Sequence, residues 1–268
     1  NDDVHDRAFE LLEAIAPADI LARVDPDDAD GDGISGRANT VWDEIAGAPT
    51  LGRFGWKAGE PHLAQQNAHA FGGDVGISNP LSLATWGDCT AGQTACREAS
   101  QGGDDDGMEA GDAVMEKLLF YTRNLAVPAR RDVDDDTVLA GKRAFYETGC
   151  ISCHTPKYVT VTLADLPELS HQLIWPYTDL LLHDMGPGLA DHRPEGQADG
   201  AEWRTPPLWG IGLTQAVSGH SQFLHDGRAR SLTEAILWHG SEAQDARDRF
   251  AAMPREEREA LITFLESL

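Results

Sequence analysis

Cys150, Cys153 and His154 form the sequence Cys-x-x-Cys-His, the most informative chemical motif in the chain. Two thiols at this spacing can form thioether bonds with the two vinyl groups of one haem. The adjacent histidine can then ligate the haem iron. The motif therefore predicts one covalently attached haem c.

Two other uses of a Cys-x-x-Cys pair have to be weighed. A thiol redox pair of the thioredoxin kind needs a βαβ context, which the sequence around 150–153 does not indicate. A zinc site needs a second Cys or His pair at ligand spacing, and none is visible. Haem attachment is the favoured interpretation.

The remaining cysteines, Cys89 and Cys96, bracket a short polar loop. Such a loop suits a disulfide, and disulfides persist in oxidising compartments. We therefore expect a periplasmic or otherwise exported protein. Two free thiols are the alternative.

A haem c iron usually takes a second axial ligand, and the identity of that ligand shifts the reduction potential. Spacing alone does not select it from the residues that follow the motif. The candidates are Met185, Met253, His171, His183, His192, His220, His225 and His239.

Basic side chains are also needed, because a buried haem propionate requires a cationic or hydrogen-bonding partner. Arg204, Arg228 and Arg230 are the candidates. Surface ion pairs are the alternative role for all three.

An acidic turn offers a different chemistry. Asp28, Asp30 and Asp32 alternate before Gly33, and alternating carboxylates can supply oxygen ligands to Ca²⁺. An EF-hand would need a bidentate Glu at its twelfth position, where this chain has Asn39. A calcium site of another kind is thus one interpretation, and a solvated acidic turn is the other.

Helical periodicity identifies the elements that must position these groups. Gly141 permits close approach of another helix, for which 254–267 is the candidate, and the charged stretch 128–136 resembles a linker. We expect a mainly α fold with a cytochrome c-like haem domain at 137–268, preceded by a helical, loop-rich domain at 1–136. The predicted helices are 7–16, 60–72, 109–126, 137–149, 231–239 and 254–267.

The composition disfavours several partners. The 268 residues include 21 Lys and Arg against 45 Asp and Glu, a formal charge of −24. Nucleic acids and anionic membranes need clustered basic residues, and no apolar run approaches the roughly 20 residues of a spanning helix. The chain begins without Met or a signal peptide, so a mature product or an excised fragment is expected.

Four longer strings carry a family resemblance over essentially the whole chain. The strings are Asp-Gly-Asp-Gly-Ile-Ser-Gly-Arg at 30–37, Tyr-Thr-Asp-Leu-Leu-Leu-His-Asp-Met-Gly at 177–186, Glu-Trp-Arg-Thr-Pro-Pro-Leu-Trp-Gly at 202–210 and Phe-Leu-His-Asp-Gly-Arg-Ala-Arg at 223–230. Together they resemble the di-haem oxidoreductases once labelled thiol oxidoreductases, a family similar to bacterial di-haem cytochrome c peroxidases and to the methylamine dehydrogenase maturation enzyme.

The resemblance implies axial ligands. The Cys-x-x-Cys-His at 150–154 matches the second, electron-transfer haem of the family, and the turn containing His225 matches the one before the sixth ligand. In peroxidases a Met follows that turn on the next helix, and the matching position here falls at about His239. The resemblance therefore favours His154 and His239 as ligands, with Met185 as second choice.

The resemblance also implies a catalytic trio. Phe-Gly-Trp-Lys at 54–57, followed by Leu-Ala-Gln-Gln and Asp-Val-Gly, is similar to a second peroxidase signature. It would make Trp56 the electron relay, Gln66 a peroxide-orienting amide and Asp74 the general acid/base. A core Trp, a helix-surface Gln and a loop Asp are the alternatives.

One departure from the family affects the expected function. The family carries two Cys-x-x-Cys-His motifs, and this chain has only the later one. Residues 1–24 resemble the segment after the missing motif, so we expect a C-terminal portion of a longer protein or a variant that has lost a haem. Residues 1–136 would then be part of a peroxidase-like domain without its own haem motif.

The expected function is electron transfer through a covalent haem, as part of a di-haem peroxidase-like enzyme. The partners would be a redox protein donor or acceptor and the missing N-terminal haem domain. A non-catalytic electron-transfer module is the alternative, and a protein in which haem only stabilises the fold is a further one.

Overall fold

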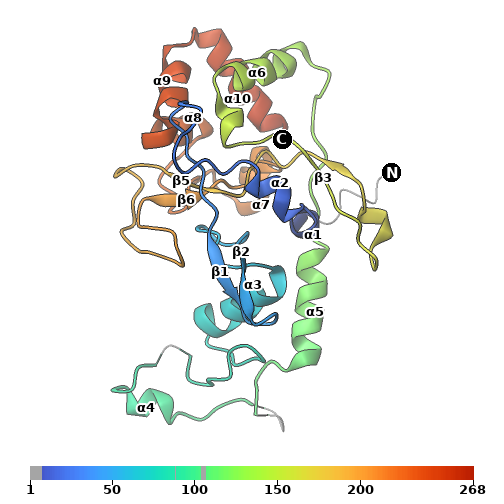
Figure 1. Cartoon of the computed structure of the whole chain (residues 1–268), viewed down its shortest axis with the longest axis vertical. Coiled ribbons are helices and arrows are strands. Elements are labelled where there is room, and N and C mark those ends of the chain that lie inside the picture. Colours follow the sequence, from blue (N-terminus) through green and yellow to red (C-terminus); the bar gives the residue numbers. More distant parts are fainter. Residues whose placement is uncertain (1–7, 88, 104–106) are drawn as a thin grey trace.

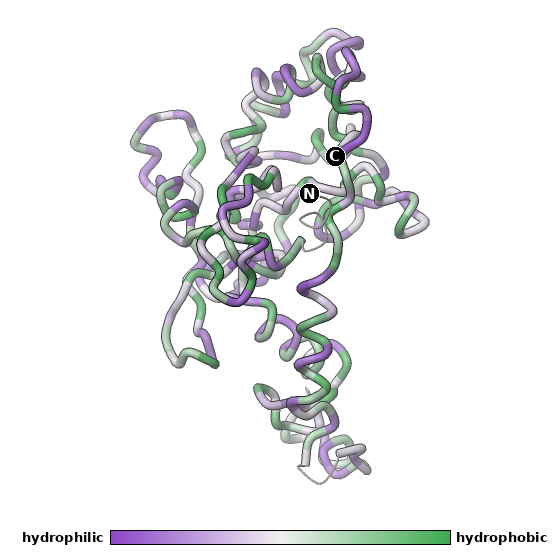
Figure 2. The backbone as a smooth tube through the Cα atoms, turned by 90° about the vertical axis from the view of Figure 1, so that its right-hand side faces the viewer, coloured by the Kyte–Doolittle hydropathy of each residue, from purple (hydrophilic) through white to green (hydrophobic). Residues whose placement is uncertain are grey.

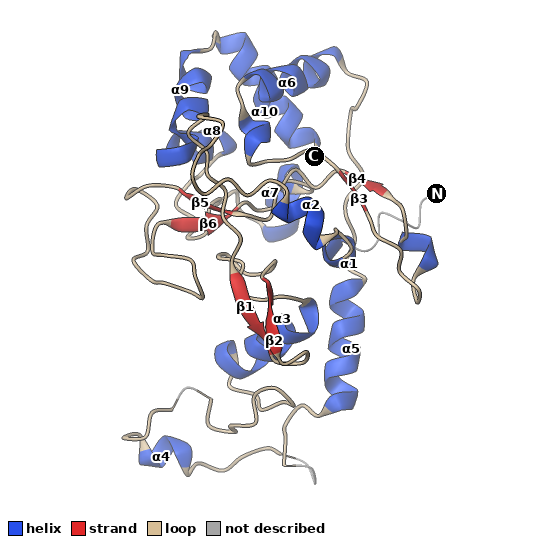
Figure 3. Ribbon diagram, viewed as in Figure 1, coloured by secondary structure: helices blue, strands red, loops and turns tan. Residues whose placement is uncertain are grey.

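The computed structural model describes residues 8–87, 89–103 and 107–268 as an elongated, mainly helical molecule (Figure 1). Its helices are joined by long loops, and its strands are short (Figure 3). The helices are α1 (Ala8–Glu13), α2 (Pro17–Leu21), α3 (Leu63–His69), α4 (Thr94–Arg97), α5 (Asp112–Arg123), α6 (Asp136–Glu147), α7 (Thr214–Ser218), α8 (Leu232–Trp238), α9 (Gln244–Ala252) and α10 (Arg255–Ser267).

All six predicted helices are present; five lie within their expected ranges, and α6 begins one residue before its range, at Asp136. Local signals explain where they begin: the Asp135 carboxylate accepts hydrogen bonds from the amides of Thr137 and Val138 before α6, and the Ser231 hydroxyl accepts one from Glu234 before α8. Figure 2 shows hydrophobic and hydrophilic residues interspersed along the helices, as expected of amphipathic helices. Short helices α2, α4 and α7, and helix α9, were not expected.

The described strands form three antiparallel pairs, none of which was predicted. They are β1 (Thr40–Asp43) with β2 (Ala48–Leu51), β3 (Tyr158–Val159) with β4 (Leu173–Ile174), and β5 (Leu182–Asp184) with β6 (Glu202–Arg204). Pairs of two to four residues are too short to leave a period-two pattern in the sequence. The β5–β6 pair lies in the middle of the molecule, between the helices of the two ends (Figure 1).

Two large hydrophobic clusters form the core. The first packs Leu11 and Phe54 against Tyr158 and Leu181. The second packs α6 against α8 and α10 through residues such as Phe264. Because the first cluster takes residues from both sides of 136, the predicted domain boundary does not separate two cores.

Helix α5 is less buried than the pattern of its apolar residues indicates. Its sequence predicts a buried apolar face, yet none of its twelve residues is buried and Tyr121 is 63% exposed. The helix packs mainly against α3 and α1, near the lower end of the molecule in Figure 1. Met115, Leu118 and Leu119 are partly buried, whereas Val114, Phe120 and Tyr121 are exposed.

The loop below α3 contains the expected disulfide. Cys89 and Cys96 are bonded to each other, which confirms their pairing, whereas Cys150 and Cys153 are free thiols. Within the described ranges, no helix has the length and apolar character needed to cross a membrane.

Helices α6 and α10 cross in direct backbone contact at Gly141, which confirms the predicted pairing. A Cβ at Gly141 would lie 1.9 Å from the carbonyl oxygen of Ala260. This crossing fixes the end of α6, from which the Cys-x-x-Cys-His segment continues.

Replacing Gly141 with Ala should force the two helices apart. We expect Gly141→Ala to lower the free energy of unfolding by about 3 kcal/mol, as overpacking of a close contact does. Urea denaturation followed by circular dichroism measures this. Gly73→Ala is the control, because a Cβ there meets open space; equal effects of the two substitutions would contradict the close-contact argument.

Candidate functional site

A cavity of about 360 Å³ lies between the α6–α10 pair, α8 and the β5–β6 pair. It contains both thiols of the motif, and its other walls are mostly apolar. The lining residues with chemical potential are Trp56, Cys150, Cys153, His154, His183, Met185, Trp203, Arg204, His225, His239 and Arg247.

The motif turns into this cavity directly after α6. Gly149 takes the left-handed conformation, with φ +91°, and so ends the helix. The amide of His154 then donates to the carbonyl of Cys150 over 2.9 Å, which closes the Cys-x-x-Cys-His segment into a turn. Both sulfurs and the imidazole therefore face the same space.

The ring of His154 is fixed in one tautomer. Its Nδ1 lies 3.0 Å from the carbonyl oxygen of Tyr177 and must donate to it, since a carbonyl can only accept. This leaves Nε2 as the atom with a lone pair for a metal. Burial lowers the pKa of His154 to about 4, so the ring is neutral at pH 7.

His239 has the same arrangement at the end of α8. Its Nδ1 donates to the carbonyl of Ala235 over 2.8 Å, and burial lowers its pKa. The two rings are close enough for a charge on His239 to lower the pKa of His154 as well. Met185 lines the same cavity, so both predicted sixth ligands are within the site.

Both thiols of the motif have a pKa above the usual value for cysteine. Burial raises the pKa of Cys150 to about 12 and also raises the pKa of Cys153. Cys153 Sγ lies 3.6 Å from the Nδ1 of His183.

Arg204 is the best counter-charge for an anionic ligand. Burial lowers its pKa to about 10, and its Nε donates to the carbonyl of Gly55 over 2.8 Å. No carboxylate in the described part of the chain forms an ion pair with it. An uncompensated cation facing an apolar cavity is costly, and the carboxylate of a haem propionate would offset that cost.

The other two predicted arginines lie outside the cavity. Arg228 pairs with Asp226 at 2.5 Å and lies over the ring of Trp238. Arg230 pairs with Glu234 at 3.0 Å, and its side chain is 84% exposed. Neither lines the cavity, so the structure supports the surface-pair alternative for both.

Aromatic rings meet at the mouth of the cavity. His225 stacks on Trp203 with ring centroids 3.6 Å apart, and its other neighbour is the ring of Trp56 at 6.5 Å. Trp56 is 51% exposed. The structure thus brings together Trp56 and His225, two residues that the family resemblance singled out.

The rest of the predicted catalytic trio is not in the cavity. Gln66 lies beside Gly55, near Trp56, but does not line the cavity. Asp74 is exposed at the end of the π-helical turn Ala70–Asp74. The roles of Gln66 and Asp74 stay predictions.

A buried charged cluster forms one wall, and the sequence analysis did not identify it. The Nε2 of His183 lies 2.8 Å from Asp179 and its Nδ1 lies 2.8 Å from Glu242. Burial opposes a charge on the ring, but Cys153 and Asp179 raise the pKa of His183 well above its usual value. With both nitrogens engaged, His183 does not serve as an axial ligand. The i,i+4 spacing of Asp179 and His183 was the one signal available.

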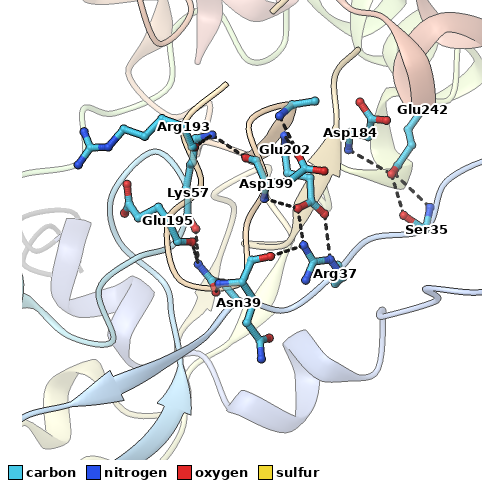
Figure 4. Close-up of polar contacts among 12 residues, drawn as sticks. Ser35, Arg37, Asn39, Lys57, Asp184, Arg193, Glu195, Asp199, Glu202 and Glu242 are labelled. Carbon is cyan, nitrogen blue, oxygen red and sulfur yellow. Dashed lines mark hydrogen bonds and ion pairs between the residues drawn. The ribbon is translucent and has the colours of Figure 1, made fainter. Parts of the chain in front are cut away.

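Polar contacts hold the wall in place (Figure 4). Glu242 accepts hydrogen bonds from the amide and hydroxyl of Ser35 and from the amide of Asp184. Lys57, 2% exposed, donates to Asp191 and to two backbone carbonyls of the loop between β5 and β6. Its ammonium also lies 4.4 Å from the ring centre of Trp203.

The three carboxylates that converge in the acidic turn are not the three that were predicted. Asp25, Asp28 and Asp30 each place a carboxylate oxygen within 4.8 Å of the others. Asp32 instead accepts the amide of Ile34 and is not part of the group. Asp25 therefore replaces Asp32 as the third candidate ligand.

Two histidines with free Nε2 atoms, two thiols and a counter-charge around one cavity define an oxidoreductase site suited to haem. The chain belongs to the family described as "Di-haem oxidoreductase, putative peroxidase", whose model matches residues 7–268. Searches of curated proteins and of solved structures return no match.

The Glu242 contacts predict a pH dependence. Burial raises the pKa of Glu242, but hydrogen bonds from His183 and Ser35 prevail and lower it to about 2. A carboxylate with a depressed folded pKa stabilises above its unfolded pKa, about 4.5, and this contribution is lost as pH falls toward 2. After a discount for partial exposure, we expect Glu242→Gln to cost about 2 kcal/mol at pH 7.

Urea denaturation between pH 7 and pH 3 measures this effect. The curve of stability against pH should be flatter for Glu242→Gln than for the parent chain below pH 4.5. Glu98→Gln, at an exposed site, is the control and should leave the curve unchanged. Parallel curves for Glu242→Gln and the parent would refute the assignment.

Proposed function

We propose that this chain is an exported c-type cytochrome oxidoreductase that transfers electrons through one haem bonded to Cys150 and Cys153. The observation that carries the proposal is the pair His154 and His239, which line the same cavity as both thiols. In each ring the Nδ1–H donates a hydrogen bond to a backbone carbonyl, which leaves Nε2 available as a ligand. When bound, the haem supplies a reversible one-electron couple at its iron.

The protein's own groups have separate tasks in this proposal. The thiols would hold the haem in place, and the Tyr177 carbonyl keeps the Nε2 of His154 free for an iron ligand bond. Arg204 would offset a propionate charge, while the apolar walls would exclude water. The α6–α10 crossing at Gly141 supports a cytochrome c-like haem domain, in which an N-terminal and a C-terminal helix pack together.

Peroxidase chemistry by the family would need the second haem as well. The sequence contains one Cys-x-x-Cys-His, and the Gln66 and Asp74 side chains do not line the cavity. A haem with two histidine ligands has no open position for peroxide. The alternative function, a non-catalytic electron-transfer module, is therefore favoured for this chain alone, with peroxide reactivity arising only beside an N-terminal haem domain.

One observation supports the exported location. The Cys89–Cys96 disulfide is typical of oxidising compartments, where c-type haem attachment also takes place. The partner in this proposal is a redox protein that exchanges one electron at a time with the haem.

Haem content and spectroscopy test the proposal directly. We expect about one covalent haem per chain by the pyridine haemochrome method, on protein made in a host with c-type maturation. His239→Ala should keep that content but change the ferric haem from low spin to high spin, because it removes the sixth ligand. Met185→Ala is the matched control and should leave the spin state unchanged.

Two results would overturn the assignment. Absence of haem would return Cys150 and Cys153 to thiol or metal chemistry. A near-infrared charge-transfer band typical of Met ligation, lost in Met185→Ala, would make Met185 the sixth ligand.

We propose Ca²⁺ binding at Asp25, Asp28 and Asp30, because their oxygens converge in a short loop. Calorimetry should give a dissociation constant in the range from about 10⁻⁴ to 10⁻³ M, and Asp28→Asn should weaken binding at least tenfold. Asp27→Asn, one residue away, is the control. No heat at millimolar Ca²⁺ would identify a solvated acidic turn instead.

A further inference from the structure

A cluster of cations surrounds Trp175, in a chain with more than twice as many acidic as basic residues. The ammonium groups of Lys142 and Lys157 lie 5.0 and 5.5 Å from the centre of the Trp175 ring. Arg130 is the third cation: its charge and that of Lys157 lower the pKa of Lys142, after the larger effect of burial. We call Arg130, Lys142, Lys157 and Trp175 the Trp175 patch.

The cations of the Trp175 patch differ from several other cations in this chain, which form ion pairs with carboxylates. Arg37, Lys57 and Arg123, for example, each pair with a carboxylate. Within the described residues, no carboxylate pairs with any of the three cations of the patch. Like charges gathered without counter-charges repel one another, and an arriving anionic surface would relieve that repulsion.

A short route through one hydrogen bond and the backbone connects the patch to the candidate haem site. The Nδ1 of His154 donates to the carbonyl of Tyr177 over 3.0 Å. Trp175 is two residues earlier in the chain, and its ring centre lies 6.4 Å from that of Tyr177. One hydrogen bond and two residues of chain thus link the candidate iron ligand to a partly exposed aromatic ring.

The surface beside the patch is hollowed. A cavity of about 120 Å³ is lined by Arg130 and Trp175 together with apolar residues, among them Ile174 and Trp209. The Nε of Arg130 is buried there without a hydrogen-bond partner. A cationic rim around a small apolar hollow is a surface to which an acidic protein face can dock.

We propose that the Trp175 patch is the docking surface for the redox partner, and that this partner presents a cluster of carboxylates around its own electron-transfer site. One electron passes between the haem and the partner's centre by way of His154, Tyr177 and Trp175. The electron path depends on the function proposed above, whereas docking to the patch does not require haem.

Charge reversal tests the docking surface. Plastocyanin, an acidic copper protein, is the probe, and its cadmium-substituted form, which exchanges no electrons, reports affinity by NMR titration. The double variant Lys142→Glu with Lys157→Glu should weaken binding about tenfold or more at low ionic strength. The difference should largely vanish at about 0.5 M salt, where the screening length is only a few ångströms.

The matched control has the same change in net charge. Lys117 and Arg193 are exposed and lie outside the patch, on α5 and on the loop between β5 and β6. We expect Lys117→Glu with Arg193→Glu to weaken binding no more than threefold. Equal losses in the two double variants would show an effect of net charge alone and would overturn the proposal.

Stopped-flow mixing of the dithionite-reduced chain with Cu(II) plastocyanin tests the electron path. One electron leaves the haem and converts Cu(II) to Cu(I), with loss of the blue absorbance. Trp175→Leu should slow electron transfer at least fivefold at saturating plastocyanin, and should leave the affinity for the cadmium form within twofold. An unchanged limiting rate would overturn the path.

Failure of the proposed function gives a different result. A chain without covalent haem that still loses plastocyanin affinity in the Lys142 and Lys157 double variant would refute the haem assignment and leave the docking surface supported. A haem-containing chain with no difference between the two double variants would refute the docking surface alone.

Discussion

The hydrogen bond from His154 Nδ1 to the Tyr177 carbonyl is the contact on which the candidate site depends. It selects the tautomer of the ring and joins the segment after α6 to the strand-rich middle of the chain. Tyr177 can offer this carbonyl because it adopts φ +53°, a conformation rare for a residue with a side chain. Packing holds it there: its ring is fully buried, between Phe145 of α6 and Phe264 of α10. The Gly141 crossing, which brings those two helices together, is thus also what aims the histidine.

Two charged side chains that line the cavity, His183 and Arg204, differ in their partners. His183 is compensated inside the protein, by Asp179 and Glu242, and that network ties β5 to Ser35 and to the segment after α8. Arg204 has only carbonyl partners and faces the cavity. A compensated ion stabilises the wall whatever occupies the space. Arg204 forms no ion pair within the described residues, and only the charge of Asp179 partly offsets the cost of its burial. An anion in the cavity would lower that cost further, so Arg204 indicates the ligand's charge as well as its place.

The sequence predicted what depends on local pattern and on a strong motif. The α6 and α10 helices, the Gly141 contact, the disulfide and the placement of Cys150 and His154 follow from spacing, capping and side-chain size. The choice of His239 and Met185 as sixth-ligand candidates and the attention to His225 came from the family resemblance, and Arg204 was a candidate on its charge alone. Their convergence on one cavity could not be derived, because these residues are separated in sequence and no period links them. The His183 cluster and the strand pairs were missed because tertiary contacts create them. Arg228 could not be distinguished from Arg204 in the sequence. Only the fold shows that Arg204 lines the cavity and that Arg228 pairs with Asp226 outside it.

Two aromatic routes lead away from the candidate haem site, and cations lie beside both. On one side, Trp56 and Trp203 both approach the ring of His225, and the Lys57 ammonium lies over the Trp203 ring. On the other side, Tyr177 and Trp175 lead to the surface through the residue that also orients His154. In the functions proposed above, the exposed Trp56, beside residues of the peroxidase-like signature, would connect the site to a second haem. Trp175, with Lys142 and Lys157 over its ring, would connect it to the redox partner.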